Sequence, residues 1–273
     1  MLSYNSIQSA YPISLHSKGR FIIREYLQYK LLEIIYTSAF APKLIFLGGT
    51  NLRIVHGNQR FSEDLDFDNK GMSTSEFDQL ADLIILKLSA EGYQVEMKTV
   101  YKGAFHCYIR FPAVLFNLGL TGHSEEKILL QLDTEPQNYA YEPNLIFLNK
   151  FDVFTQIFTT PLETLLAQKY YAVLNRPRNK GRDFYDIVFI LSKIKEPDYS
   201  YLEQKLGIKT HAQLKEAILS HCSTLNMNEM ANDVAPFLFQ PSEVIQVQRF
   251  PSYLRSILWN YLYPWSPSRV RLI

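Results

Sequence analysis

The sequence has little of what marks secreted or membrane proteins. It has only two cysteines, Cys107 and Cys222, and neither lies in a metal-binding spacing, which favours a reducing compartment over a disulfide framework. No basic start followed by a long apolar run marks a signal peptide. No apolar run approaches the roughly 20 residues that cross a bilayer. We therefore expect a cytoplasmic protein without a membrane partner.

An excess of charge of one sign is also missing, since 28 basic residues face 27 acidic ones. This excludes a global attraction to nucleic acid but leaves room for a local basic patch. The chain does have length and apolar content, with 273 residues of which 47% are hydrophobic. These numbers exclude disorder and suffice for one large domain or two modest ones.

Apolar periodicity divides the chain into a mixed part and a helical part. In the first part we expect helices over residues 21–40, 50–57 and 74–91, strands over 44–47, 65–67, 93–101, 104–112 and 127–133, and one or two short strands over 145–158. At Thr160 and Pro161 a helix start follows, and the pattern stays mainly helical. The sequence thus predicts an α+β fold, with a mixed sheet flanked by helices over residues 1–159 and a helical domain over residues 160–273.

The motif Gly48-Gly49-Thr50 lies between the predicted buried strand and the next helix. Glycines at this place let backbone N–H groups and the helix dipole approach phosphate. A tight turn is the alternative interpretation of the two glycines. Thr50 either caps the helix or bonds a phosphate, and the sequence leaves both open.

Alternating carboxylates follow on the next strand, where Asp64 and Asp66 project to the same side, roughly 7 Å apart. Two carboxylates this close suit a divalent ion such as Mg²⁺ or Mn²⁺, which also takes substrate phosphate oxygens. Asp133 follows a strand-like run and is the best candidate for a third metal ligand. An exposed acidic strand face is the alternative, but the glycine motif ahead of the aspartates favours the metal site.

Two residues before the aspartates are candidate nucleotide contacts, Arg60 and Ser62. The alternative for Arg60 is an ion pair with Glu63, to which we assign a structural role.

A second cluster combines Lys169 with a basic loop that runs into two aspartates. The loop carries Arg176, Arg178, Lys180 and Arg182, and the aspartates are Asp183 and Asp186. Such a loop is either a solvated face or a clamp for triphosphate or RNA phosphates. Arg182 and Asp186 could form an exposed ion pair four residues apart, and Lys169 could extend along an apolar surface.

In order and spacing, these motifs resemble the AbiEii/AbiGii-type nucleotidyltransferases, toxins of bacterial toxin–antitoxin and abortive-infection systems. The matching residues are Gly48-Gly49-Thr50 with Leu52, Arg60-x-Ser62-Glu63-Asp64-Leu65-Asp66-Phe67, Lys169, and Arg178-x-x-x-Arg182-Asp183-Phe184-Tyr185-Asp186. The resemblance implies a polymerase β-like nucleotidyltransferase core followed by a helical domain. It implies metal ligands at Asp64 and Asp66, phosphate contacts around Gly49 and Thr50, and triphosphate binding by Lys169. It also implies an essential acid at Asp183 or Asp186.

The leading hypothesis is an Mg²⁺-dependent nucleotidyltransferase toxin that moves a nucleoside monophosphate from an NTP to RNA, at the 3′ end of tRNA as for some relatives. A cognate antitoxin is the expected protein partner. The candidate catalytic residues are Asp64, Asp66, Asp133, Lys169 and Asp186, and the candidate nucleotide contacts are Gly48, Gly49, Thr50, Arg60, Ser62, Lys169, Arg182 and Asp183. Two alternatives stay open: a nucleotide-binding regulator without transferase activity, and a transferase that modifies a protein or a small molecule.

Overall fold

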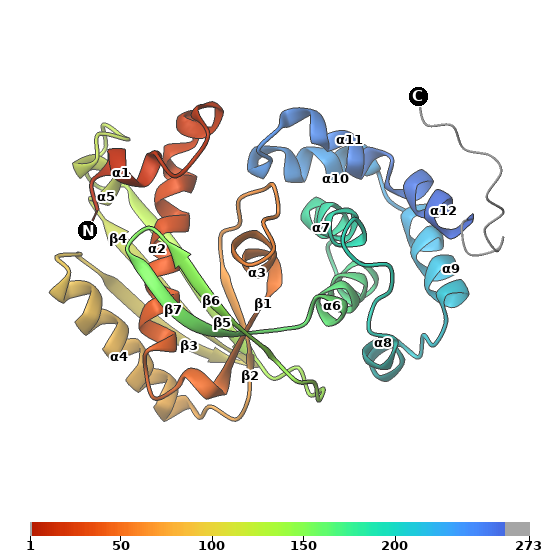
Figure 1. The fold of residues 1–273 in the computed structure, drawn as a ribbon, viewed down its shortest axis with the longest axis horizontal. Coiled ribbons are helices and arrows are strands. Elements are labelled where there is room, and N and C mark those ends of the chain that lie inside the picture. Colours follow the sequence, from red (N-terminus) through yellow and green to blue (C-terminus); the bar gives the residue numbers. More distant parts are fainter. Residues whose placement is uncertain (1, 260–273) are drawn as a thin grey trace. The chain divides into compact units, whose positions relative to one another are not determined.

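The computed structural model describes residues 2–259 and divides into two compact units, the first ending at Pro161 and the second beginning at Leu162 (Figure 1). The first unit contains a mixed sheet with helices, and the second consists of helices. Residues 260–273 of the predicted helical domain lie outside the described residues.

A seven-stranded sheet forms the first unit, in the order β3-β4-β5-β2-β1-β7-β6. The strands are β1 (Leu44–Leu47), β2 (Leu65–Asn69), β3 (Glu96–Lys102), β4 (Ala104–Pro112), β5 (Lys127–Glu135), β6 (Asn144–Lys150) and β7 (Val153–Thr159). The pairs β2–β5 and β1–β7 are parallel, and the remaining pairs are antiparallel. The predicted mixed sheet is therefore confirmed, and the run at 145–158 forms a two-stranded hairpin.

Several helices accompany the sheet. They are α1 (Tyr4–Gln8), the 3₁₀ turns η1 (Ile13–Lys18) and η2 (Ala41–Lys43), α2 (Gly19–Tyr36), α3 (Gly48–Ile54), α4 (Thr74–Ala90) and α5 (Val114–Asn117). Helix α4 lies where the periodicity predicts it. Helix α3 begins at Gly48 rather than at Thr50, because the backbone of Gly48, with φ of +80°, turns directly from strand to helix.

Strands β3 to β5 bury one face and expose the other. On the buried face, Phe105 packs its ring 5.5 Å from that of Phe77 on α4. Alternate residues of the neighbouring strands join this core, namely Cys107, Ile109, Phe111, Ile128, Leu130 and Leu132. Because side chains alternate along a strand, the residues between them lie on the other face of the sheet.

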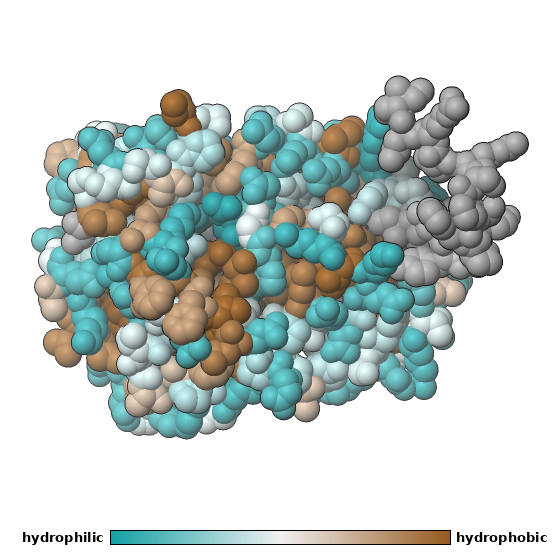
Figure 2. Space-filling view, in the orientation of Figure 1, coloured by the Kyte–Doolittle hydropathy of each residue, from teal (hydrophilic) through white to brown (hydrophobic). Residues whose placement is uncertain are grey.

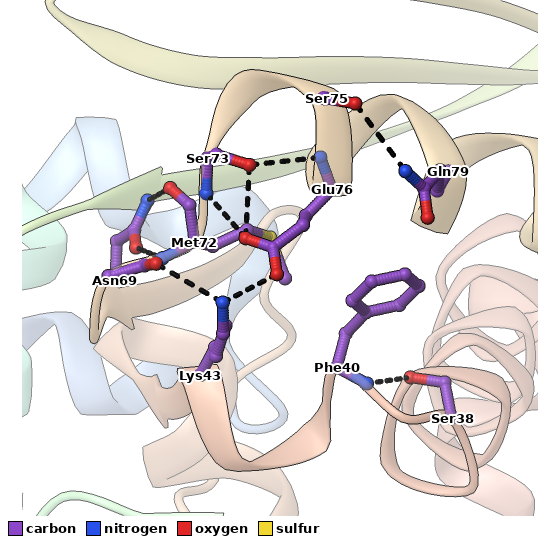
Figure 3. Close-up of polar contacts among 10 residues, drawn as sticks. Ser38, Phe40, Lys43, Asn69, Met72, Ser73, Ser75, Glu76 and Gln79 are labelled. Carbon is purple, nitrogen blue, oxygen red and sulfur yellow. Dashed lines mark hydrogen bonds and ion pairs between the residues drawn. The ribbon is translucent and has the colours of Figure 1, made fainter.

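Polar contacts hold the start of α4 next to Lys43 of η2 and Asn69 at the end of β2 (Figure 3). Ser73 caps the helix, and the Glu76 carboxylate accepts a hydrogen bond from the Ser73 backbone N–H. Lys43 Nζ lies 2.5 Å from Glu76 Oε1, and the Asn69 side chain bonds the backbone of Met72. The hydrogen bond from Lys43, with those from Ser73, lowers the pKa of Glu76 to about 2.

The second unit is helical throughout its described part. Its helices are α6 (Leu162–Asn175), α7 (Gly181–Leu191), α8 (Tyr199–Leu206), α9 (His211–Cys222), α10 (Met227–Val234), η3 (Ala235–Phe237), η4 (Pro241–Glu243), α11 (Val244–Gln248) and α12 (Phe250–Trp259). Helices α7 and α10 pack so closely that a Cβ on Gly181 would collide with the Met230 carbonyl. Between residues 2 and 259, no helix is both long and apolar enough to cross a membrane.

Candidate active site

The Gly48-Gly49 turn joins β1 to α3 and lies directly against the Asp66 carboxylate. A Cβ on Gly48 would collide with that carboxylate, and a Cβ on Gly49 would collide with the Arg60 guanidinium. Asp66 is also the register partner of Leu47, the last residue of β1. Close approach therefore favours glycine at both positions, and the start of α3 lies against Asp66, the second of the predicted metal ligands.

Asp133 lies directly beside Asp66 in the sheet. Strands β2 and β5 are parallel and pair these two residues in register, and neighbouring strands lie about 4.7–4.9 Å apart. Paired residues share a face, so the two carboxylates project to the same side. Asp64 precedes β2, and its backbone carbonyl accepts a hydrogen bond from the Thr50 hydroxyl.

His106 on β4 extends this row of side chains by one strand. It pairs in register with Asp133, and its Nδ1 lies 2.7 Å from Asp133 Oδ1. The Gln131 amide nitrogen lies 2.9 Å from both carboxylate oxygens. Neither residue was predicted as part of the site, although His106 alternates along a predicted strand with Phe105 and the buried Cys107. That alternation places it on the polar face, but no local pattern gives its partner.

Asp68 continues the alternation of Asp64 and Asp66 but serves the fold. Its side chain is only 1% exposed. It accepts hydrogen bonds from the Tyr141 hydroxyl at 2.8 Å and the Gln137 N–H at 2.9 Å, and Lys70 Nζ lies 2.7 Å away. These partners leave Asp68 no access to substrate.

The donor set fits a magnesium ion that shares its coordination with substrate. Among residues 2–259, no three His, Cys, Asp or Glu side chains are arranged as a metal-binding group. Mg²⁺ is, however, commonly held by one or two carboxylates together with substrate phosphates and waters. Asp66 and Asp133 supply two carboxylates on one face beside the glycine turn, which matches that requirement. Ligation by Asp64 stays a prediction.

The other predicted nucleotide contacts of this unit are buried behind the turn. Thr50 is fully buried and Arg60 is 1% exposed, and Arg60 Nη1 donates to the Phe61 carbonyl at 2.9 Å. A Cβ on Gly49 would also lie 3.0 Å from Ser62 Oγ. Arg60 therefore places its positive charge beneath the backbone of the turn. Direct phosphate contact by these residues stays a prediction.

Helix α2 positions both the turn helix and the segment that leads into β2. Gln28 donates to the carbonyls of Ser62 at 3.1 Å and Glu63 at 2.9 Å. The buried Glu25 accepts from Arg53 of α3 at 2.7 Å and from Lys150 at 2.8 Å. Burial alone would raise the pKa of Glu25, but the charges of Arg53 and Lys150 lower it below its ordinary value.

In the second unit, the predicted residues of α6 and α7 form a buried charge cluster. Lys169 Nζ lies 2.9 Å from Asp183 Oδ1 and 2.8 Å from Asp186 Oδ2. Asp183 Oδ2 also meets Arg176 Nη1 at 2.9 Å. The structure brings Lys169, Asp183 and Asp186 together, and the pairing of Lys169 with both acids was not predicted.

The guanidinium carbon of Arg182 lies 4.7 Å from the centre of the Phe237 ring. The neighbouring basic residues Arg178 and Lys180 are exposed.

Comparison with known proteins points to one family. The family model described as "Nucleotidyl transferase AbiEii toxin, Type IV TA system" matches residues 30–240. No curated protein sequence matches the chain. Among solved structures, JHP933 from Helicobacter pylori is similar with a TM-score of 0.53 and 16% identity, covering 89% of this chain and 94% of that one. A candidate nucleotidyltransferase from H. pylori has a TM-score of 0.52 and 16% identity, with 88% and 96% covered. At this identity, the two structures show a shared fold.

Proposed function

From its membership of the AbiEii family of nucleotidyltransferase toxins from type IV toxin–antitoxin systems, we propose a function for this chain. It is a metal-dependent enzyme that transfers NMP from an NTP to RNA. We further propose Mg²⁺ or Mn²⁺ as the metal, the 3′ end of tRNA as the acceptor and the cytoplasm as its location. The family implies an NTP substrate and an antitoxin partner. The observation that carries the proposal is the register of Asp66 with Asp133, beside the Gly48-Gly49 turn.

The residues of the first unit have distinct roles in this mechanism. Backbone N–H groups at Gly48 and Gly49 bind the phosphates, with the buried charge of Arg60 beneath them and with Thr50 and Ser62 as supports. Asp64, Asp66 and Asp133 would hold the divalent ion, which when bound neutralises phosphate charge. Positioning and charge neutralisation are most of what phosphoryl and nucleotidyl transfer require.

The transfer itself is one displacement at phosphorus. The acceptor hydroxyl oxygen forms a bond to the α-phosphorus, and the bond from that phosphorus to the bridging oxygen breaks. Pyrophosphate leaves with the electron pair. The hydroxyl proton passes to the Asp133 carboxylate or to solvent, and His106 and Gln131 hold that carboxylate in place.

The roles of the residues in the second unit are proposed from the family resemblance. We assign triphosphate binding to Lys169, nucleotide contacts to Arg182 and Asp183, and an essential acid to Asp186. The ion pairs of Lys169 with both aspartates support a common role, because each partner fixes the orientation of the others.

A labelling experiment tests the proposal. Purified protein is incubated with Mg²⁺, total RNA and each α-labelled NTP in turn. We expect label in RNA with wild-type protein, no label with Asp66→Ala, and full label with Lys87→Ala, an exposed change on α4. Equal labelling by Asp66→Ala would contradict the site assignment. Label in protein but not in RNA would identify the alternative acceptor class, and NTP binding without pyrophosphate release would identify a regulator.

A further inference from the structure

The exposed face of strands β3 to β5 continues directly from the proposed metal ligands. The register aligns Val100, His106 and Asp133 in one row across these strands, and Asp66 of β2 extends the row. The next row aligns Lys98, Tyr108 and Gln131. Directly paired residues project to the same face. We call this surface the acceptor face, and its members on β3 and β4 are Lys98, Val100, Lys102, His106, Tyr108 and Arg110.

This face combines aromatic rings with cations. The rings of His106 and Tyr108 are stacked, with centroids 6.4 Å apart and an interplanar angle of 27°. Lys98 and Lys102 are exposed, and Arg110 is half-buried. Two acids besides Asp133 also lie on the face. Glu96 is neutralised by Lys127 at 2.7 Å, and Glu135 is exposed at the end of β5.

In-line chemistry determines which side of the metal ligands the acceptor must approach. The attacking oxygen and the leaving pyrophosphate lie on opposite sides of the α-phosphorus. The Gly48-Gly49 turn, which we assign to the phosphates, follows β1, and the sheet order is β3-β4-β5-β2-β1. The acceptor therefore approaches from the β5, β4 and β3 side, which is the acceptor face.

We propose that the acceptor face binds the 3′-terminal nucleotides of a single-stranded RNA end. The bases stack on Tyr108 and His106, and Lys98, Lys102 and Arg110 contact the backbone phosphates. Aromatic planes flanked by cations are the combination by which proteins hold single-stranded nucleic acid, because every base offers a π-face and every linkage a negative charge. This inference rests on the proposed nucleotidyl transfer and adds the surface that takes its second substrate.

Binding measurements on the full-length protein test the acceptor face. The probe is a 5′-fluorescent oligoribonucleotide with an unpaired 3′ end, measured by anisotropy over a series of salt concentrations. We expect Tyr108→Ala to weaken binding about tenfold or more, since one base loses its stacking partner. The double variant Lys98→Ala, Lys102→Ala should weaken binding and reduce the salt dependence by about two released counterions. NTP affinity should stay unchanged in both.

Two matched variants control for general effects. Phe154→Ala removes a 67% exposed ring on the β6–β7 hairpin at the other edge of the sheet, where Phe154 stacks on Phe147. Lys87→Ala removes an exposed charge on α4. Both should bind the RNA as wild type does, and Tyr108→Phe should restore binding lost in Tyr108→Ala.

The outcomes separate this inference from the proposed function. Wild-type protein could label RNA while the Tyr108 and Lys98/Lys102 variants bind and label it equally well. That result would contradict RNA binding at the acceptor face but leave the proposed nucleotidyl transfer intact. The same conclusion follows if Phe154→Ala loses as much binding as Tyr108→Ala. If wild-type protein labels no RNA, the proposed function fails, and the acceptor face fails with it. Because Lys98 and Lys102 are exposed, their variant tests the face even where Tyr108→Ala does not fold.

Discussion

At the scale of single residues, the candidate site depends on the absence of Cβ atoms at Gly48 and Gly49. Their missing Cβ atoms make room for the Asp66 carboxylate on one side and the Arg60 guanidinium on the other. Asp66 and Asp68 show how neighbouring carboxylates divide their roles. Asp66 lies beside Asp133 at a half-buried surface, while Asp68 is enclosed by Lys70, Tyr141 and Gln137.

We predict opposite effects for the two carboxylates. Asp66→Asn should reduce transfer at least about 100-fold, because charge stabilisation at the reacting phosphate is lost, with little change in melting temperature. Asp68→Asn should lower the free energy of unfolding by about 1–3 kcal/mol, because buried donors lose a charged acceptor. Single-turnover labelling and thermal denaturation measure the two effects. A destabilised Asp66→Asn protein with normal transfer per folded molecule would reverse the assignment.

Gly48 provides a second residue-scale prediction. Gly48→Ala should cost about 1–2 kcal/mol for a side chain at positive φ and should also abolish transfer, because the new methyl group displaces Asp66. The matched control is Gly71→Ala, which has φ of +86° but open space around it. It should lose similar stability and keep its activity. Denaturant melts and labelling of both variants check the comparison.

The residue pattern predicted Asp66 and Asp133 for one site, because strand alternation and a third carboxylate at the end of a strand-like run are local features. It did not predict that His106 bonds Asp133, since the register of β4 with β5 depends on tertiary packing. The burial of Thr50, Arg60 and Asp68 was likewise not predictable, because an alternating strand pattern gives the face of a residue and not what covers it.

At the scale of elements, helices α2 and α4 contact different parts of the first unit. Helix α2 fixes the segment before β2 through Gln28 and fixes α3 through Glu25 and Arg53. Helix α4 is joined to η2, directly before β1, by the Lys43–Glu76 ion pair. The position of α4 was predictable from its local apolar periodicity, and the capping box of Ser73 and Glu76 also marks its start. The start of α3 was not, because the glycines themselves form its first turn.

The ion pair of α4 predicts a dependence of stability on pH. The folded-state pKa of Glu76, about 2, lies below its ordinary value of 4.5, so its contribution to stability is complete above pH 4.5 and is lost as pH falls through about 2. Wild type and Glu76→Gln should therefore differ most near neutral pH and converge toward pH 2. Ser73→Ala should lose about 1 kcal/mol from the missing cap, with a smaller change across that range. Urea unfolding at several pH values measures both.

At the scale of the whole molecule, the mixed sheet and the helical second part follow the predicted order, because periodicity changes near Thr160. The family motifs occur in both units, and the second unit supplies Lys169, Asp183 and Asp186. Periodicity could identify these residues as helical and charged. Their mutual pairing depends on how α6 packs against α7, which no local pattern contains.

The charge cluster of the second unit predicts a separable effect on stability and function. Asp186→Asn should cost about 3–5 kcal/mol, because it leaves part of a buried ion cluster uncompensated. The double variant Lys169→Met, Asp186→Leu should recover much of that stability, since Arg176 still pairs with Asp183. If Lys169 binds triphosphate, the folded double variant should not bind NTP. NTP binding at wild-type affinity would show that the cluster is only structural. Calorimetry and nucleotide titration give both readouts.

The order of strands in the sheet also governs when the proposed site can form during synthesis of the chain. Strand β1 lies between β2 and β7, and Asp66 has no neighbouring carboxylate until β5 has been translated. At roughly 5–20 residues per second, the ribosome needs several seconds to extend the chain from Leu47 to Val153. For most of that interval the nascent chain carries the Gly48-Gly49 turn, Asp64 and Asp66 but no complete sheet. The proposed site therefore cannot form before β5 joins the sheet, because Asp133 lies on that late strand.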